Sequence, residues 1–301
     1  MLARIFTCAF VLLLSTAGAR ADDYAQELAV ERAERVKRLT APEGWLSLIG
    51  LHFLAPGENT VGRAPENKVV LAAGPARFGT MVLAEDGSVR LQVTPGVEAL
   101  VNGEPVLSVN LGDGRTGRPV SVVCGTMSIH VIERGGQRAL RVRDSASERR
   151  SRFAGIDYFP VDPAWRIEAA WEDFDRPREV PIKNILGQES KALVLGRAVF
   201  TRDGHTLALL PLQESPDEPL FFIISDLTSG VETYGAARFL YADPPKGGKV
   251  VLDFNRAINP PCAFTPFATC PLPPKENQLP VAVTAGEKDY RGEHKQGASS
   301  K

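Results

Sequence analysis

The chain has 301 residues, of which 35 are Lys or Arg and 36 are Asp or Glu, so its formal net charge is −1. This balance excludes the strongly basic field that attracts nucleic acid, and we expect no nucleic-acid partner. With 44% hydrophobic and 24% charged residues, the composition is that of an ordinary globular protein. The length suits one large or two modest domains.

The first 21 residues have the pattern of a secretory signal peptide. Arg4 precedes an apolar run over residues 5–14, and small residues follow up to Ala19-Arg20-Ala21. The run is about half of the roughly 20 residues needed to span a bilayer, so we expect no membrane span. We therefore predict cleavage after Ala21 and a periplasmic or secreted protein.

Residues 22–43 are predicted to form a helical segment. Asp22 and Asp23 precede a stretch of good helix formers, and acidic residues come early in it and basic residues late. This order complements the helix dipole and predicts a capped helix over about 23–39. The apolar face is thin, so we expect the helix to lie on the surface of a larger body.

Residues 44–144 consist of short apolar runs separated by Gly, Pro, Asn and Asp. Many short strands at close spacing, with turn residues between them, predict an antiparallel β-sandwich. The alternation is clearest at residues 88–93, where Val89, Leu91 and Val93 should face the core and Arg90 and Gln92 the solvent.

The same region resembles a forkhead-associated domain. The resemblance rests on the segments 57–63 (GENTVGR), 101–103 (VNG) and 111–114 (LGDG). Members of that family that bind phosphothreonine use an arginine, which Arg63 matches, together with a Ser-x-x-His turn. Residues 75–79 (PARFG) replace that turn. The resemblance therefore implies a β-sandwich scaffold without the phosphopeptide site.

Residues 145–160 are predicted to be a linker, 161–288 a second antiparallel β-domain, and 289–301 a disordered polar tail. Pro160 and Pro163 restrict the residues before them to extended conformations at the start of this domain. The predicted strands lie in the segments WRIEAAWE, KNILGQ, LVLGRAVF, HTLALLPL, LFFIISD, VETYGAARFLYAD and KVVLDF. The whole protein is therefore expected to be mainly β, with two sandwich-like or barrel-like domains after one N-terminal helix.

A proline-dense loop with two cysteines follows the last predicted strand. Prolines remove backbone donors, so this loop must be held by side chains or cross-links. In an oxidising compartment Cys262 and Cys270 are predicted to form a disulfide, which would stabilise the fold by roughly 2–3 kcal/mol. The alternative is that Cys262 stays reduced and acts as a nucleophile near a base. Cys124 is expected to be a buried, inert thiol.

The order of the motifs resembles the domain-of-unknown-function family 1684 over most of the chain after residue 21. The motifs that carry the resemblance are GWLSLIGLHFL, ENTVGRAPENKVVL, IDYFPVDPAWRI, TYGAARFLYAD and the long segment LDFNRAINPPCAFTPFATCPLPPKENQLPVAVTAGEK. The resemblance implies that these segments belong together, and it implies no activity.

The candidate site lies where the predicted strands carry polar residues on one face. If residues 231–241 are one strand, Glu232, Tyr234 and Arg238 share a face opposite the core residues. The ligand-binding candidates are Tyr234, Arg238, Asp253, Asn255, Arg256 and Asn259. The alternative is that both faces are solvent faces, with Arg238 paired to Asp253, or that the Asp and Asn residues satisfy loop backbone.

Known catalytic and metal-binding motifs are missing from the sequence. It contains no G-x-S-x-G elbow, no H-E-x-x-H and no Gly-rich phosphate loop, and its four histidines are scattered, so we expect no metal and no cofactor. The favoured function is a ligand-binding or structural envelope module whose partner is an unknown small molecule or envelope protein. The alternative is an envelope hydrolase in which Arg238 binds an anionic or carbonyl group and Asp253 is the general base.

Overall fold

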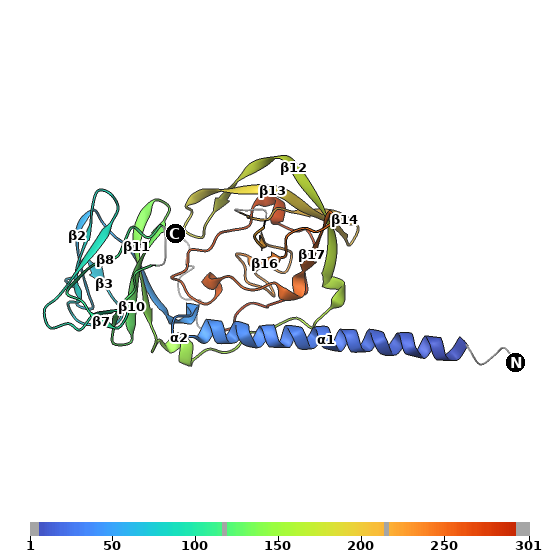
Figure 1. The fold of residues 1–301 in the computed structure, drawn as a ribbon, viewed down its shortest axis with the longest axis horizontal. Coiled ribbons are helices and arrows are strands. Elements are labelled where there is room, and N and C mark those ends of the chain that lie inside the picture. The colour runs from blue at the N-terminus through green and yellow to red at the C-terminus, as the bar shows by residue number, and fades with distance from the viewer. Residues whose placement is uncertain (1–5, 116–118, 214–216, 293–301) are drawn as a thin grey trace. The chain divides into compact units, whose positions relative to one another are not determined.

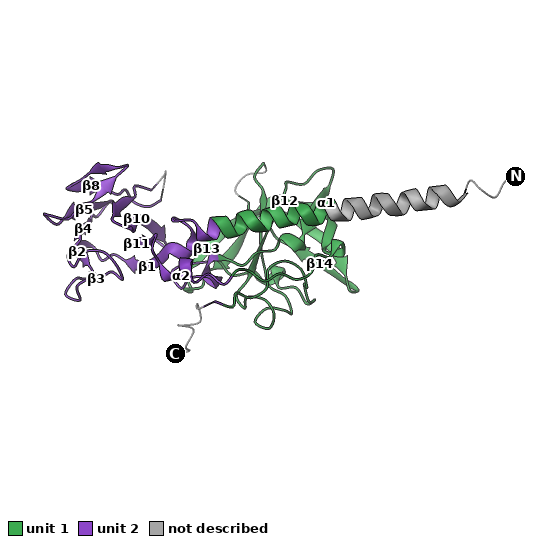
Figure 2. Cartoon of the chain, turned by 90° about the horizontal axis from the view of Figure 1, so that it is seen from below, with its two compact units in different colours: residues 1–37, 155–260, 271–291 green, residues 38–154, 261–270, 292–301 purple. Residues whose placement is uncertain are grey.

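The fold is seen in a computed structural model that describes residues 6–115, 119–213 and 217–292, with side chains from residue 23 onward (Figure 1). Two compact units share the chain (Figure 2). Unit 1 comprises residues 1–37, 155–260 and 271–291, and unit 2 comprises residues 38–154, 261–270 and 292–301. The proline-dense loop is divided between the units. Residues 261–270, which include both cysteines, belong to unit 2, and the residues before and after them belong to unit 1.

Unit 2 is built from two sheets. The first has six strands in the order β1-β11-β10-β9-β6-β7. Their bounds are β1 Leu48–Phe53, β6 Leu100–Val101, β7 Glu104–Pro105, β9 Val122–Cys124, β10 Met127–Arg134 and β11 Gln137–Asp144. The second has five strands in the order β3-β2-β4-β5-β8. Their bounds are β2 Gly57–Gly62, β3 Val69–Val70, β4 Gly79–Leu83, β5 Val89–Val93 and β8 Ser108–Asn110.

The two sheets of unit 2 share one hydrophobic core. Met81 and Leu91 of the five-stranded sheet and Ile129 and Leu140 of the six-stranded sheet belong to the same buried cluster. Strand β5 alternates between buried and exposed positions as its sequence predicts. Side chains that alternate in this way place apolar groups on one face only, which is why the sheets close on each other as a sandwich.

Unit 1 contains a four-stranded sheet in the order β14-β13-β12-β17 and a separate β15-β16 pair. Their bounds are β12 Arg166–Lys183, β13 Glu189–Arg202, β14 His205–Leu209, β15 Leu220–Ile224, β16 Arg238–Ala242 and β17 Lys249–Asp253. Strands β12 and β13 form a long antiparallel hairpin (Figure 1). The expected mainly β fold with antiparallel sheets and one N-terminal helix is confirmed.

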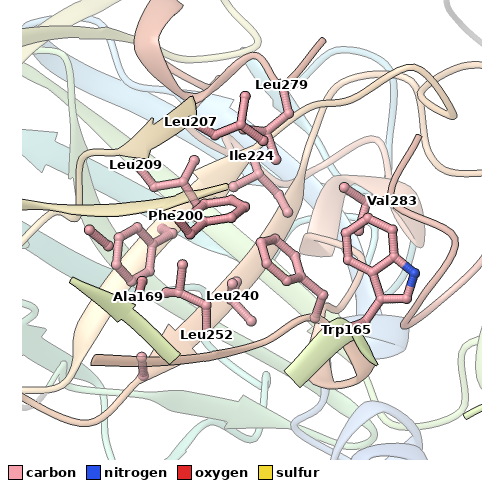
Figure 3. Packing of buried hydrophobic residues seen from close by; sticks show 14 of the residues in the cluster. Trp165, Ala169, Phe200, Leu207, Leu209, Ile224, Leu240, Leu252, Leu279 and Val283 are labelled. Atoms are coloured by element: carbon pink, nitrogen blue, oxygen red, sulfur yellow. The ribbon is translucent and has the colours of Figure 1, made fainter. Parts of the chain in front are cut away.

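Aromatic and aliphatic side chains from both sheets of unit 1 meet in its core (Figure 3). Phe254 is fully buried, and its ring lies edge-on to Trp165 at 5.6 Å between centroids and 5.9 Å from Phe200. Leu279 and Val283, from the C-terminal segment that follows the loop, are part of the same cluster. The segment that follows the loop is therefore anchored in this core.

The described chain also contains two α-helices and five 3-10 turns. Helix α1 spans Phe6–Thr40 and α2 spans Glu148–Ser151. The 3-10 turns are η1 Trp45–Ser47, η2 Pro163–Trp165, η3 Phe254–Arg256, η4 Pro261–Ala263 and η5 Lys275–Asn277. Helix α1 covers the predicted range 23–39 and begins earlier. None of the helices in the described part of the chain is both long and apolar enough to cross a membrane.

Two strands expected from the sequence are turns in the structure. The predicted strand 231–241 is wrong except at its end, because β16 begins at Arg238. The carbonyl oxygen of Thr228 accepts the backbone N–H groups of residues 231, 232 and 233, which closes a compact turn. The predicted strand 183–188 is the turn between β12 and β13, where Gly187 has a φ of +77°, a conformation that favours glycine.

Of the predicted disordered tail, 289–301, the structure describes residues 289–292. Tyr290 is 5% exposed, and Arg291 donates to Asp157 at 2.5 Å, so the first residues of the tail pack on unit 1. The rest of the predicted tail, 293–301, and the side chains of the predicted signal peptide lie outside the described residues.

Candidate functional site

Asp253, one of the predicted site residues, lies at the end of β17 and is 5% exposed. The Tyr24 hydroxyl of α1 donates toward both of its carboxylate oxygens, at 2.7 and 2.8 Å. The backbone N–H of Asn255 donates to Oδ1 at 3.2 Å, so Asp253 also caps η3. Its carboxylate therefore connects the N-terminal helix to the turn that follows β17.

Arg256 continues this connection. Its guanidinium donates to Asp253 Oδ2 at 3.0 Å and to Glu27 at 2.6 Å, and it also pairs with Glu31. The two glutamates lie one helical turn apart on α1, so one arginine can reach both. The side chain of Asn255 exchanges two hydrogen bonds with the backbone of Asp162 at 2.8 and 3.0 Å.

Asn259 belongs to a second network, built around a buried carboxylate. The Glu287 side chain has no exposed surface, and it accepts from Arg35 Nε of α1 at 3.1 Å and from the backbone N–H of Asn259 at 2.7 Å. Arg35 also donates to the Asn259 carbonyl at 2.8 Å. Burial raises the pKa of Glu287, and Arg35 and the Asn259 N–H oppose that shift.

Arg238 lies in a third network and pairs with Asp226, not with Asp253 as the alternative interpretation of the sequence had it. Its Nη2 is 2.8 Å from Asp226 Oδ2 and 2.9 Å from the Val283 carbonyl, and Nη1 donates to the carbonyl of Ala285 at 2.5 Å. Arg238 is 1% exposed. Tyr234 is half-buried in the turn before β16 and does not share a strand with Arg238.

The structure therefore brings Asp253, Asn255 and Arg256 together and places Arg238 in a separate network. These residues join α1 and the C-terminal segment to the sheets of unit 1. Asp, Asn and Arg hold irregular backbone as readily as they bind a ligand, so the sequence pattern alone does not distinguish these two uses.

A cleft of about 560 Å³ lies elsewhere in unit 1, and we call it the proline-walled cleft. Its lining residues are Pro181, Lys183, Ser225, Asp226, Ser229, Gly235, Ala236, Leu272, Pro273, Pro274, Lys275 and Gln278. A neighbouring cleft of about 390 Å³ shares Pro181, Pro274 and Lys275 with it and adds Arg178 and Arg197. Sequence reasoning missed Lys183 and Lys275, although the proline run 271–274 marked this wall as rigid.

Two kinds of contact fix the wall of the proline-walled cleft. The backbone N–H of Leu272 donates to the Lys183 carbonyl at 2.8 Å, which ties the wall to β12. Asn277 has no exposed surface, and its side chain bonds the backbone of Leu210 in both directions and the carbonyl of Ile223. The cleft therefore has a preformed wall, as small-molecule sites usually do.

Unit 2 holds the two cysteines of the proline-dense loop, beside the six-stranded sheet. Cys262 and Cys270 are both buried thiols, and the backbone N–H of Cys262 donates to Cys270 Sγ at 3.2 Å. Their predicted disulfide is not formed in this structure. Arg134 of β10 donates to Thr269 Oγ1 at 2.9 Å, which holds the loop to the sheet.

Histidine and arginine side chains crowd the same sheet. His130 and Arg141 are directly opposite each other on β10 and β11, and each is 7% exposed. Burial, followed by the charges of Arg143 and Arg141, lowers the pKa of His130 to about 4. His130 is therefore neutral at pH 7. Within the described residues, no three His, Cys, Asp or Glu side chains gather as a metal site would require.

Replacing Arg35 with alanine should lower the free energy of unfolding by about 3 kcal/mol, because Glu287 would be left as a buried, uncompensated carboxylate. The matched control is Lys37→Ala on the same helix, where the side chain is 76% exposed, and it should stay within about 0.5 kcal/mol of the native value. Urea unfolding of both variants measures this difference. Equal losses would contradict the assignment of Arg35 as the anchor of α1.

His130 should make the protein less stable in mild acid. Its folded pKa lies below the unfolded value of about 6.5, so protons bind the unfolded state preferentially between roughly pH 6.5 and 4. The stabilising contribution is present above pH 6.5 and is lost as the pH falls toward 4. Between pH 7.5 and 5 this loss amounts to about 2 kcal/mol.

The test compares urea unfolding at these two pH values for the native protein, His130→Gln and the exposed-site control His205→Gln. The native protein and the control should share the acid-dependent loss, and His130→Gln should lack that part of it. A native-like pH dependence in His130→Gln would show that another group is responsible.

Comparison with known proteins places the larger part of unit 1 in a family. Residues 151–288 match the family model described as "Protein of unknown function (DUF1684)". An uncharacterized protein of Haloarcula marismortui, known from a solution NMR structure, is 32% identical. The match covers 47% of this chain and 80% of that one, with a TM-score of 0.40. No curated protein matches. Through residues 151–288 the chain belongs to the DUF1684 family.

Proposed function

We propose that this protein is an exported, non-enzymatic binding module that takes a small anionic molecule in the proline-walled cleft of unit 1. The observation that carries the proposal is a cleft of about 560 Å³ flanked by Lys183 and Lys275. This volume lies within the range of roughly 300–1,000 Å³ typical of small-molecule sites. All of its lining residues fall inside the stretch 151–288 that matches the family model.

The lining supports a carboxylate or phosphate group as the part of the ligand that is recognised. Lys275 is exposed, and Lys183 pairs with Glu189 at 3.0 Å with both side chains more than 60% exposed, a weak pair that an anion can displace. Ser225, Ser229 and Gln278 add hydrogen-bonding groups to the lining. Asp226 is already neutralised by Arg238, so it does not repel an anion strongly.

The occupied state of Asp253 supports a binding role over the alternative of an envelope hydrolase. A general base needs a free oxygen within hydrogen-bond reach of the proton that it removes. Both oxygens of Asp253 already accept from Tyr24, and Arg256 and Arg166 lie 3.0 and 3.8 Å from Oδ2. Arg238, the proposed electrophile of that alternative, is enclosed in its pair with Asp226.

The binding proposal is tested by calorimetric titration with citrate, succinate, inorganic phosphate and glucose 6-phosphate, with neutral glucose for comparison. We expect at least one anion to bind and glucose not to bind. The double variant Lys183→Gln, Lys275→Gln should bind that anion roughly tenfold more weakly or worse, since each lost charge removes about a kcal/mol.

The matched control is Lys246→Gln, Lys249→Gln, which removes the same charge from two exposed residues of unit 1 outside the cleft, on either side of the turn that leads into β17. It should bind the anion as the native protein does. Failure of every anion to bind, or an equal loss in both double variants, would contradict the proposed site.

Export is the second part of the proposal, and it rests on the N-terminal pattern of charged, apolar and small residues. The intact mass of the protein recovered from the periplasm or medium should correspond to a chain that begins at Asp22. Ala21→Leu should block this cleavage, because the peptidase requires small residues there, and Ala17→Leu should not. Recovery of the uncleaved chain in the cytoplasm would overturn this part. The forkhead-associated-like scaffold of residues 44–144 stays a prediction.

A further inference from the structure

A second cleft of unit 1, of about 390 Å³, adjoins the proline-walled cleft, and we call it the neighbouring cleft. Pro181, Pro274 and Lys275 line both clefts, so the two meet at these residues. The proposed function uses the lysines of the proline-walled cleft and leaves the neighbouring cleft without a role. A ligand bound by those lysines is therefore placed to extend into the neighbouring cleft.

The neighbouring cleft has an apolar wall. Val180 and Leu210 are 9% and 8% exposed and belong to one buried cluster of unit 1, and the half-buried Phe174 packs against that cluster. All three residues line the cleft. Pro181 and Pro274 continue this surface into the proline-walled cleft, and neither has a backbone N–H to offer. Such a lining suits the hydrocarbon part of a ligand.

Arg178 is a cation on this apolar side of β12. Alternate residues of a strand share a face, so Arg178 lies on the face of Val180, and its cross-strand partner is the buried Val194. The register of β12 and β13 is irregular just before this point, where residues 174–177 lie opposite residue 195. This bulge bends the strand and brings Phe174 toward Arg178, whose Cζ lies 3.7 Å from the centre of the ring.

The contact with Phe174 leaves the donor groups of Arg178 available. The ring covers one face of the planar guanidinium, whereas the N–H groups point outward along its edge. Arg178 is exposed, and its guanidinium forms no ion pair or hydrogen bond within the described part of the chain. The ring therefore positions a guanidinium that is ready to donate two hydrogen bonds to a carboxylate or phosphate group.

The charges around the neighbouring cleft leave a positive excess. Two ion pairs at 2.7 Å compensate four of these charges, and they are Arg197–Glu172 and Lys191–Glu179. Three lining residues, Arg178, Lys275 and Glu276, have no ion-pair partner among the residues described. Two uncompensated cations thus accompany one carboxylate, which favours a ligand that brings further negative charge.

We propose that the ligand of unit 1 is an elongated dianion, with one acidic group in each cleft and an apolar chain between them. Lys183 and Lys275 bind the first acidic group, and Arg178 binds the second. The apolar chain lies along Pro181 and Pro274. This inference rests on the proposed function, because it assigns the second end of the same ligand. The ligand class is a long-chain dicarboxylate or a diphosphate of similar length.

The test is calorimetric titration of the full chain, at constant ionic strength, with succinate, adipate and suberate. Butyrate, hexanoate and octanoate are the monoanions of matched length, and alkane diphosphonates show which acidic group is preferred. Adipate or suberate should bind more tightly than succinate, because a short chain cannot place an acidic group in both clefts. The best dicarboxylate should bind roughly tenfold more tightly than its matched monoanion, since its second acidic group gains a charge-assisted bond to arginine.

Arg178→Gln should remove this advantage of the dianion and leave the binding of the monoanion unchanged. The matched control is Arg176→Gln, because Arg176 is an exposed arginine of the same strand that lines neither cleft. The control should keep the native preference for the dianion. Because both arginines are exposed, we expect both variants to fold.

Three results would overturn the inference. In the first, matched monoanions and dianions bind equally and both lose affinity in the double variant Lys183→Gln, Lys275→Gln, so that the proposed anion site stands and the dianion is wrong. In the second, Arg176→Gln and Arg178→Gln reduce the preference for the dianion equally, so that Arg178 does not hold the second acidic group. In the third, no dicarboxylate or diphosphonate binds, and the titrations with citrate, phosphate and glucose 6-phosphate then decide the proposed function separately.

Discussion

The buried ion pair between Arg35 and Glu287 is the contact on which the arrangement of unit 1 depends most. Glu287 lies in a C-terminal segment that forms no named strand after residue 271, and its backbone pairs only at separate points, such as the bridge between Tyr158 and Glu287. Side chains add to these few backbone contacts. Arg35 donates to the Glu287 carboxylate and to the Asn259 carbonyl. Arg238 likewise donates to the backbone carbonyls of residues 283 and 285. Because an unpaired buried carboxylate is strongly unfavourable, helix α1 and this segment stabilise each other.

The need for side chains to hold irregular backbone and a helix also explains why the polar residues near the end of β17 resemble a binding site in the sequence. Asp253, Asn255 and Arg256 are the residue types that bind ligands, and they are also the types that satisfy loop backbone and dock a helix. Their use is decided by Tyr24 and Glu27, each 229 residues away along the chain from the group that it contacts. Sequence patterns within a strand carry no information about a partner at that separation, so the site and the scaffold could not be told apart.

Much of the fold could be predicted where local patterns decide the structure. The alternation in β5 and the short apolar runs of unit 2 are enough to predict the strands and the face of each strand that is buried. This works because side chains alternate between the two faces of a strand, so apolar residues at every second position must face the core. The prediction was wrong at residues 231–237, where Thr228 closes a turn with three backbone donors and apolar alternation is only apparent. The proline-walled cleft could be predicted only as a rigid loop, since Lys183 and Lys275 come from segments that meet through the backbone contact of Leu272.

Two buried arginines differ in the groups that compensate their positive charge. Arg238 of unit 1 meets Asp226 and two carbonyl oxygens, so its positive charge is compensated and its role is structural. Arg141 of unit 2 is also buried, yet its Cζ lies 5.3 Å from the centre of the Trp45 ring, and among the described residues no carboxylate forms an ion pair with it. The groups that surround a buried arginine, and not its burial alone, therefore decide how costly its charge is to the fold.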